Sequence, residues 1–152
     1  MMSSDALIVK VLSAGTLIMV AKFMSTEWIR LVGKQWDTHP EIQKDLKNFN
    51  ATWEYYIEDR PDVPHVMLFC KAGKVIYAGP SDGRRRDFIM WTSMDHWQKI
   101  LSGEISGKSA LMTRRLKFKG SMMTAMKYMT PFNIHLNILG EIPANPESAP
   151  SG

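Results

Sequence analysis

Cysteine is nearly absent from this chain of 152 residues, since Cys70 is the single one. One cysteine excludes an internal disulfide and a zinc site built on paired cysteines, so stability must come from packing. This usage is typical of a reducing compartment, and the cytoplasm is the expected location. With 45% hydrophobic residues, the chain has the composition of one globular domain, long enough to bury about two-thirds of the surface that its unfolded chain exposes.

Catalytic and metal-binding patterns are missing from the sequence as well. The four histidines, His39, His65, His96 and His135, lack metal-ligand spacing, and there is neither a Gly-x-Ser-x-Gly motif nor a glycine-rich phosphate loop. Cys70 lies inside an expected strand, where a thiol is typically an inert small hydrophobe. We therefore expect no catalytic residue, no metal site and no cofactor.

Long hydrophobic runs are scarce too. The stretch from Ala6 to Phe23 is interrupted by Lys10 and Lys22, and it is shorter than the roughly 20 apolar residues that a spanning helix needs. Three interpretations stay open: a buried or interfacial helix, a leader upstream of a natural start at Met24, or a membrane anchor. The sequence thus divides into an apolar leader or extra N-terminal helix (1–23), a domain (24–142) and a disordered, proline-rich tail (143–152).

The rest of the chain alternates between helical and strand periodicity. Apolar residues at helical spacing predict helices at 26–36, 40–49, 92–101 and 121–129. Alternating residues predict strands at 52–58, 65–71, 74–78, 85–92 and 115–119.

The order of these elements indicates the fold class. The first four strands form an expected meander, with a tight hairpin at Ala72-Gly73. Pro131 should end the last helix, and the apolar segment 132–138 has no assigned type. Such an order implies an α+β domain, with an antiparallel sheet covered on one face by helices.

Methionine is in excess, with twelve in the chain. Met122, Met126 and Met129 share one helical face, Met123 lies beside them, and Met112 lies just upstream. Methionines at helical spacing are most often core residues, but flexible, polarizable side chains also suit a cavity that accepts varied ligands. In both cases Met126 should point inward.

The same region is basic. Between Lys108 and Lys127 the sequence has no Asp or Glu. Three interpretations are open: a solvated strand edge and helix face, a docking patch for anionic lipid head groups, or a clamp for the phosphates of acyl-CoA. The basic residues are Lys108, Arg114, Arg115, Lys117, Lys119 and Lys127.

Residues 97–129 carry a family resemblance. They read W-Q-K-I-L-S-G-E-I-S-G-K-S-A-L-M-T-R-R-L-K-F-K-G-S-M-M-T-A-M-K-Y-M. An apolar helix ending in Leu-Ser-Gly, a Ser-Ala pair, a basic-apolar strand ending in Gly and an Ala-Met-Lys core follow one another as in the sterol carrier protein type-two family. The chain resembles that family over about 24–129. One departure is Leu-Met-Thr-Arg at 111–114, where members commonly have Phe-Phe, a small polar residue and Gly.

The resemblance implies a five-stranded antiparallel sheet with an apolar tunnel or cavity between sheet and helices. It also implies a lining and a head-group contact. The implied lining comprises Trp97, Leu101, Leu111, Met112, Met122, Met123, Met126 and Met129. The implied head-group or anionic-surface contacts are Arg114, Arg115, Lys117, Lys119 and Lys127.

The expected function is non-catalytic binding and transfer of a fatty acid, acyl-CoA, phospholipid or sterol-like lipid. Transient contact with an anionic membrane surface would suit the basic stretch, and no nucleic-acid partner is expected. Two alternatives are open: an anionic-surface or nucleic-acid binder acting through 108–127, and an accessory domain of a lipid-metabolising enzyme.

Overall fold

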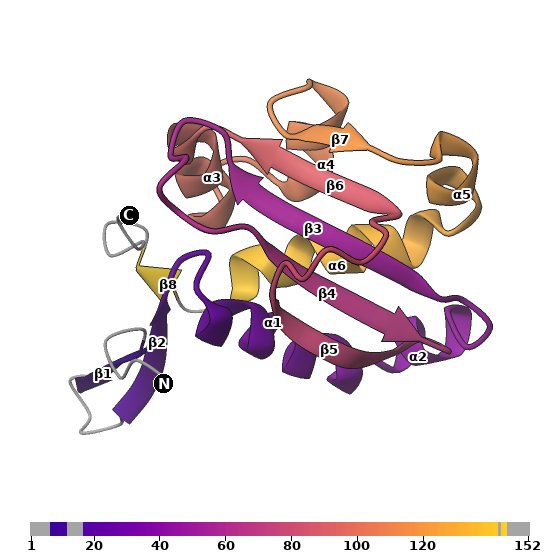
Figure 1. The fold of residues 1–152 in the computed structure, drawn as a ribbon, viewed down its shortest axis with the longest axis horizontal. Coiled ribbons are helices and arrows are strands. Elements are labelled where there is room, and N and C mark those ends of the chain that lie inside the picture. Colours follow the sequence, from indigo (N-terminus) through magenta and orange to yellow (C-terminus); the bar gives the residue numbers. More distant parts are fainter. Residues whose placement is uncertain (1–6, 12–16, 143, 146–152) are drawn as a thin grey trace.

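The computed structural model describes residues 7–11, 17–142 and 144–145. Figure 1 shows a five-stranded sheet backed by helices, with a small second sheet at one end. The expected tail at 143–152 lies outside the described residues except for Ala144 and Asn145, which form the short strand β8.

The α+β class is confirmed, and the elements follow one another with short connections. The helices are α1 (Thr26–Thr38), α2 (Pro40–Asp45), α3 (Met94–Leu101), α4 (Gly107–Met112), α5 (Met122–Lys127) and α6 (Met129–Glu141). The strands are β1 (Leu7–Val11), β2 (Leu17–Lys22), β3 (Ala51–Ile57), β4 (Val66–Lys71), β5 (Lys74–Pro80), β6 (Phe88–Thr92), β7 (Lys117–Lys119) and β8 (Ala144–Asn145).

The main sheet is mixed, so the expectation of a purely antiparallel meander is wrong. Its order is β5-β4-β3-β6-β7. The hairpin between β4 and β5 is confirmed, and Ala72 and Gly73 both have positive φ at its turn, as a tight type I′ hairpin requires. β6, however, pairs with β3 in parallel, with Trp53 opposite Phe88, instead of continuing beside β5.

The crossing between β5 and β6 is held by polar contacts to β3. The carboxylate of Asp87 accepts a hydrogen bond from the backbone N–H of Thr52 at 2.9 Å, and the Asp87 N–H donates to the Thr52 carbonyl at 3.0 Å. The Arg86 guanidinium lies 3.2 Å from the carboxylate of Glu54, which is buried. A buried carboxylate needs such partners, so these contacts fix the loop 81–87 across the sheet.

Helices α1 and α6 lie side by side behind the sheet (Figure 1). Segment 132–138, left unassigned by its sequence, belongs to α6. Pro131 does not end the helical region, because it lies in the first turn of α6, where its missing N–H would have had no partner. Helix α4, which is capped by the Ser106 hydroxyl, was not predicted, because its six residues are too few to show helical periodicity.

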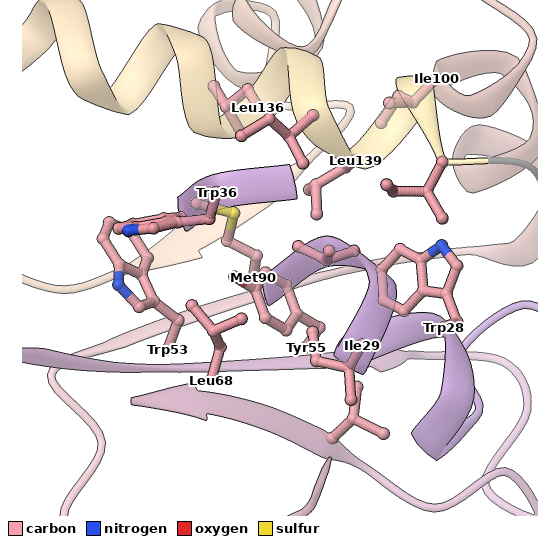
Figure 2. Close-up of a cluster of buried hydrophobic side chains, with 14 of the residues drawn as sticks. Trp28, Ile29, Trp36, Trp53, Tyr55, Leu68, Met90, Ile100, Leu136 and Leu139 are labelled. Carbon is pink, nitrogen blue, oxygen red and sulfur yellow. The ribbon is translucent and has the colours of Figure 1, made fainter. Parts of the chain in front are cut away.

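The core lies between these two helices and the sheet, and it is rich in indole rings (Figure 2). Trp28 and Trp36 from α1 meet Trp53 and Tyr55 from β3, and all four are fully buried. The ring centroids of Trp36 and Trp53 lie 6.1 Å apart in an edge-on arrangement. The alternation seen in the sequence of β3 thus marks the residues that face the helices.

The described part of the N-terminal segment forms strands, whereas one interpretation of its sequence was a helix. Its described residues form the strands β1 and β2, which pair antiparallel, with Leu7 opposite Ala21. Phe23, which follows β2, is fully buried, and its ring lies 4.9 Å from Trp28 and 5.5 Å from Trp97 between centroids. The packed core therefore extends to the N-terminal side of Met24.

We predict that Phe23→Ala lowers the free energy of unfolding by about 3–5 kcal/mol, because it leaves a void between two buried indoles. Chemical denaturation measures this loss. Ile76→Ala is the control, since Ile76 is 57% exposed and should change stability by no more than about 0.5 kcal/mol. A loss below about 1 kcal/mol for Phe23→Ala would instead support a dispensable leader that ends before Met24.

Candidate functional site

A pocket of about 520 Å³ opens at the β7 edge of the main sheet. Its walls come from four elements and one loop: β6, α4, the loop 113–116, β7 and α5. Because β7 is the edge strand, side chains from both faces of the sheet reach this pocket. The lining residues are Trp91, Leu111, Arg114, Leu116, Lys117, Phe118 and Met122.

The pocket unites residues that the sequence placed in two separate groups. Leu111 and Met122 were expected in the apolar lining, and Arg114 and Lys117 were expected to contact a head group. The structure places all four around one opening. Sequence reasoning missed Trp91 as a lining residue and used Phe118 only as part of a strand. The alternation of apolar residues with Lys117 and Lys119 was the sequence signal that could have identified Phe118 as a lining residue.

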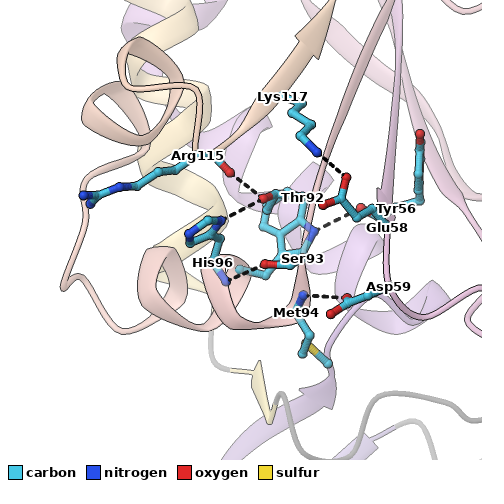
Figure 3. Close-up of polar contacts among 10 residues, drawn as sticks. Tyr56, Glu58, Asp59, Thr92, Ser93, Met94, His96, Arg115 and Lys117 are labelled. Atoms are coloured by element: carbon cyan, nitrogen blue, oxygen red, sulfur yellow. Dashed lines mark hydrogen bonds and ion pairs between the residues drawn. The ribbon is translucent and has the colours of Figure 1, made fainter.

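A polar network anchors the wall formed by β7 and the preceding loop (Figure 3). The hydroxyl of Thr92, which is buried, donates to the Arg115 carbonyl, and Lys117 pairs with Glu58 at 2.5 Å. The Thr92 hydroxyl also lies 3.3 Å from Nδ1 of His96. These bonds tie the loop after α4 to the ends of β3 and β6.

Arg114 has a left-handed backbone, with φ of 62°. For a residue with a Cβ, this conformation costs about 1–2 kcal/mol relative to the right-handed one. Hydrogen bonds from the Arg115 and Leu116 N–H groups to the Ala110 carbonyl, at 2.8 and 2.9 Å, close the turn and hold it. The exposed guanidinium-bearing side chain of Arg114 therefore stands at the pocket on a strained but fixed turn.

The methionines point outward, so the expectation that Met126 faces inward is wrong. Met126 is 68% exposed and Met123 is 83% exposed, while Ala125 is the buried residue of α5. The helical spacing correctly grouped the methionines, but the small side chain of Ala125 is what meets the core. Consequently, truncation of Met126 would leave no void in the core.

Other expected site residues lie apart from this pocket. Trp97 on α3 is fully buried, and its indole N–H donates to the Tyr56 carbonyl at 3.0 Å. Leu101 lies at the C-terminal end of the same helix and is partly buried. Met126 and Met129 line a second pocket of about 450 Å³, beside Lys127. Met112, Met123, Arg115 and Lys119 are exposed side chains outside both pockets.

Aromatic rings occupy the space between α6 and the sheet, where the resemblance implied a tunnel. The Trp53 ring lies 4.4 Å from the imidazole of His135 and 4.7 Å from the ring of Phe132, between centroids. Trp36 approaches His135 to 4.9 Å. The described part of the chain thus shows a packed interior and no tunnel at this position.

Two polar groups meet inside that interior. Nε2 of His135 lies 2.5 Å from the Tyr55 hydroxyl, and both residues are fully buried. Burial lowers the pKa of His135 to about 3, because an imidazolium there would lose its hydration. Burial also raises the pKa of Tyr55 well above its usual value. Both side chains are therefore uncharged at neutral pH.

Cys70 has the environment of an inert thiol. It is buried in β4, and this burial raises its pKa to about 11. Because the thiolate is the nucleophile, a thiol that stays protonated at neutral pH is unsuited to covalent chemistry. Within the described residues, moreover, no three His, Cys, Asp or Glu side chains gather in a way that would hold a metal ion. None of the described helices has the length and apolar character needed to cross a membrane.

The family model that matches this chain is the SCP-2 sterol transfer family, over residues 31–133. That match begins within α1 and includes α2, the whole main sheet and the helices α4 and α5 of the pocket. The chain belongs to the SCP-2 sterol transfer family, as its C-terminal motif predicted.

Solved structures of the same fold agree with this assignment. A crystal structure of sterol carrier protein 2 has a TM-score of 0.68 at 18% identity and covers 80% of this chain and 99% of its own. A conserved hypothetical protein of Thermus thermophilus, described as possibly a sterol carrier protein, has a TM-score of 0.67 at 19% identity, with 84% and 94% covered.

Curated relatives match over a shorter stretch. Hydroxysteroid dehydrogenase-like protein 2 of Bos taurus is 38% identical over 60 residues, which cover 40% of this chain and 14% of that protein. The Mus musculus protein of the same name is 38% identical over 72 residues, covering 45% and 14%. The chain therefore corresponds to about a seventh of the length of these relatives.

We predict an acid-sensitive fold that depends on His135. Its folded pKa of about 3 lies below the 6.5 of the free side chain, so the unfolded chain binds the proton more tightly. The stability from the neutral imidazole is complete above pH 6.5 and is lost as the pH falls from 6.5 toward 3, by up to about 4 kcal/mol. Urea unfolding at several pH values measures this slope.

His135→Gln provides the comparison. It should lower stability at pH 7, because Tyr55 and the surrounding rings lose a fitted partner, but its stability should fall less between pH 6.5 and 4. Parallel pH profiles for the two proteins would show that other groups cause the acid sensitivity.

Proposed function

We propose that this chain binds a single-chain anionic lipid, a fatty acid or acyl-CoA, and carries it without chemical change. The convergence of apolar Leu111 and Met122 with cationic Arg114 and Lys117 around one pocket supports this function most directly. Membership in a sterol transfer family gives independent support for an apolar ligand.

The lining suits a ligand with an apolar chain and an anionic end. Trp91, Leu116 and Phe118 offer aromatic and aliphatic surface, and Arg114 and Lys117 stand at the same opening. A pocket of about 520 Å³ lies within the range of small-molecule sites. Arginine binds carboxylates and phosphates through paired N–H groups, whereas lysine acts as a point charge. A fatty acid presents a carboxylate to these cations, and acyl-CoA presents phosphates.

The energetics permit a working carrier. Burial of about twelve methylenes gives a gross gain of roughly 10 kcal/mol. Loss of translational and rotational freedom removes at least several kcal/mol of this gain, which leaves affinity in the micromolar range. Such a complex holds its ligand in water and still releases it to a membrane or an enzyme.

The strained backbone of Arg114 is a further support. Glycine would adopt φ of 62° at little cost, yet the position holds a long cationic side chain. Unfavourable backbone conformations persist where they serve a function or are over-determined by their surroundings. We interpret the strain as the cost of placing a guanidinium at the pocket mouth.

Two other functions remain as predictions. An accessory role beside a lipid-metabolising enzyme would suit the longer, dehydrogenase-like relatives, of which this chain spans a small part. Nucleic-acid binding through the basic stretch 108–127 is the second alternative. Salt distinguishes this alternative, since phosphate-backbone binding weakens steeply with ionic strength, whereas burial of an acyl chain does not.

We predict that the protein binds a fluorescent fatty acid at micromolar concentration and releases it to an unlabelled competitor, in low and in high salt. Leu111→Ser should weaken binding about tenfold or more, because an apolar wall becomes polar. Leu101→Ser on α3, also partly buried but outside the pocket, is the matched control and should retain affinity. No displacement at high micromolar ligand in either salt would refute the proposal.

A second test exploits the strain at Arg114. Arg114→Gly should raise the free energy of unfolding by up to about 1 kcal/mol, because the relief of the left-handed conformation exceeds the entropy cost of glycine. It should also weaken fatty-acid binding several-fold, because the guanidinium is lost.

Arg115→Gly removes the same charge from the neighbouring residue, which has no positive φ and lies outside the pocket. It should lower stability by roughly 0.5–1 kcal/mol and leave affinity nearly unchanged. Equal effects of the two variants on fatty-acid affinity would show that Arg114 has no special role at the pocket.

A further inference from the structure

Five exposed methionines lie on α4, on α5 and at the start of α6, close to the pocket along the chain. Among the described residues, the large hydrophobic side chains with high exposure are these five and Ile76 of β5. Isolated exposed methionines are ordinary, but five within 18 residues of sequence are not. We call this group the methionine surface, and it comprises Met112 (75% exposed), Met122 (60%), Met123 (83%), Met126 (68%) and Met129 (44%).

The five methionines lie on α4, on α5 and at the first residue of α6, and both α4 and α5 pack against α6. Met122 shares the pocket of about 520 Å³ with Leu111, the residue before Met112. Met126 lies one helical turn after Met122 on α5, and it shares the second pocket, of about 450 Å³, with Met129. In Figure 1, α5 lies at the end of the molecule opposite the small sheet of β1, β2 and β8, so the described N-terminal strands do not cover it.

The charge around this surface is predominantly positive. From Ile105 to Gly140 the sequence contains six Lys and Arg residues and no Asp or Glu. Within the described residues, Lys117 is paired with Glu58, and Asp45 at the rim of the second pocket is an acidic neighbour. Lys119 and Lys127 are both exposed, and Lys127 also lines the second pocket. Across residues 17–142, neither lysine forms a salt bridge.

We propose that the methionine surface docks on an anionic lipid bilayer, with Lys119 and Lys127 facing the head groups. Apolar side chains flanked by cations suit the boundary between head groups and acyl chains. Flexible, polarizable methionines adapt to a surface without fixed shape. Charge argues against a second copy of this chain, because a two-fold contact would bring two acid-free basic segments together.

Docking on a bilayer would serve the proposed function, and the biological role of the docking rests on that function. The mouth of the ligand pocket includes Met122, so contact through the methionine surface would bring Leu111 and Arg114 to the membrane. A lipid could then pass between bilayer and pocket without crossing bulk water. Docking itself does not require a bound ligand, and the two properties can therefore be measured apart.

The experiment is flotation of the full chain with vesicles of phosphatidylcholine alone and with added phosphatidylserine. The protein should float with the phosphatidylserine vesicles and much less with the neutral ones. The double variant Met112→Ser with Met123→Ser should reduce flotation several-fold while fatty-acid displacement stays unchanged, because both residues lie outside the ligand pocket. Ile76→Ser removes an exposed apolar side chain from β5 and should float like the unchanged protein.

Charge is tested separately. Lys119→Gln with Lys127→Gln should weaken flotation roughly tenfold or more, whereas Lys71→Gln with Lys74→Gln, an equal charge change at the β4–β5 turn, should have a much smaller effect. Equal flotation with neutral and anionic vesicles would overturn the proposal, as would unchanged flotation of the methionine variant. Absence of flotation together with a stable dimer in solution would assign the surface to a second copy instead.

Discussion

The parallel pairing of β3 with β6 is the constraint on which the rest of the domain depends. It is set where the chain crosses the sheet, by the hydrogen bonds between Asp87 and Thr52 and by the ion pair between Arg86 and Glu54. Because β6 lies beside β3, its other edge is free to pair with β7. The pocket at β7, with Trp91 and Phe118 in its wall, follows from that placement.

Local pattern predicted the elements of the main sheet but not their pairing. Alternation in β3 marked the residues that face the helices, and the Ala-Gly turn marked the hairpin of β4 and β5. The parallel neighbour of β3 was missed because no local signal distinguishes a strand that continues a meander from one that crosses it. The deciding contacts join Asp87 to Thr52 and Arg86 to Glu54, pairs more than 30 residues apart.

The candidate site, like the sheet, was predicted only in part from the sequence. The family motif identified Leu111, Arg114, Lys117 and Met122 as residues of interest, and the structure places them around one pocket. The helical spacing of the methionines grouped them correctly, but periodicity defines a face and not the direction in which it points. That direction depends on how α5 packs, and Ala125 makes its buried contact. The left-handed turn at Arg114 was missed because arginine does not usually mark such a turn, although the related family commonly has Gly at this position.

Two routes into this fold differ in how much of the packed core they disturb. Entry between α6 and the sheet would have to separate rings that pack at centroid distances of 4.4 to 4.9 Å, and would break the contact between His135 and Tyr55. Displacement of α5 would expose little of the core, since Ala125 is its buried residue. Segments with few buried contacts open at the lowest free energy. Of these two routes, opening beside α5 disturbs less of the packed core, and α5 contributes Met122 to the cationic pocket.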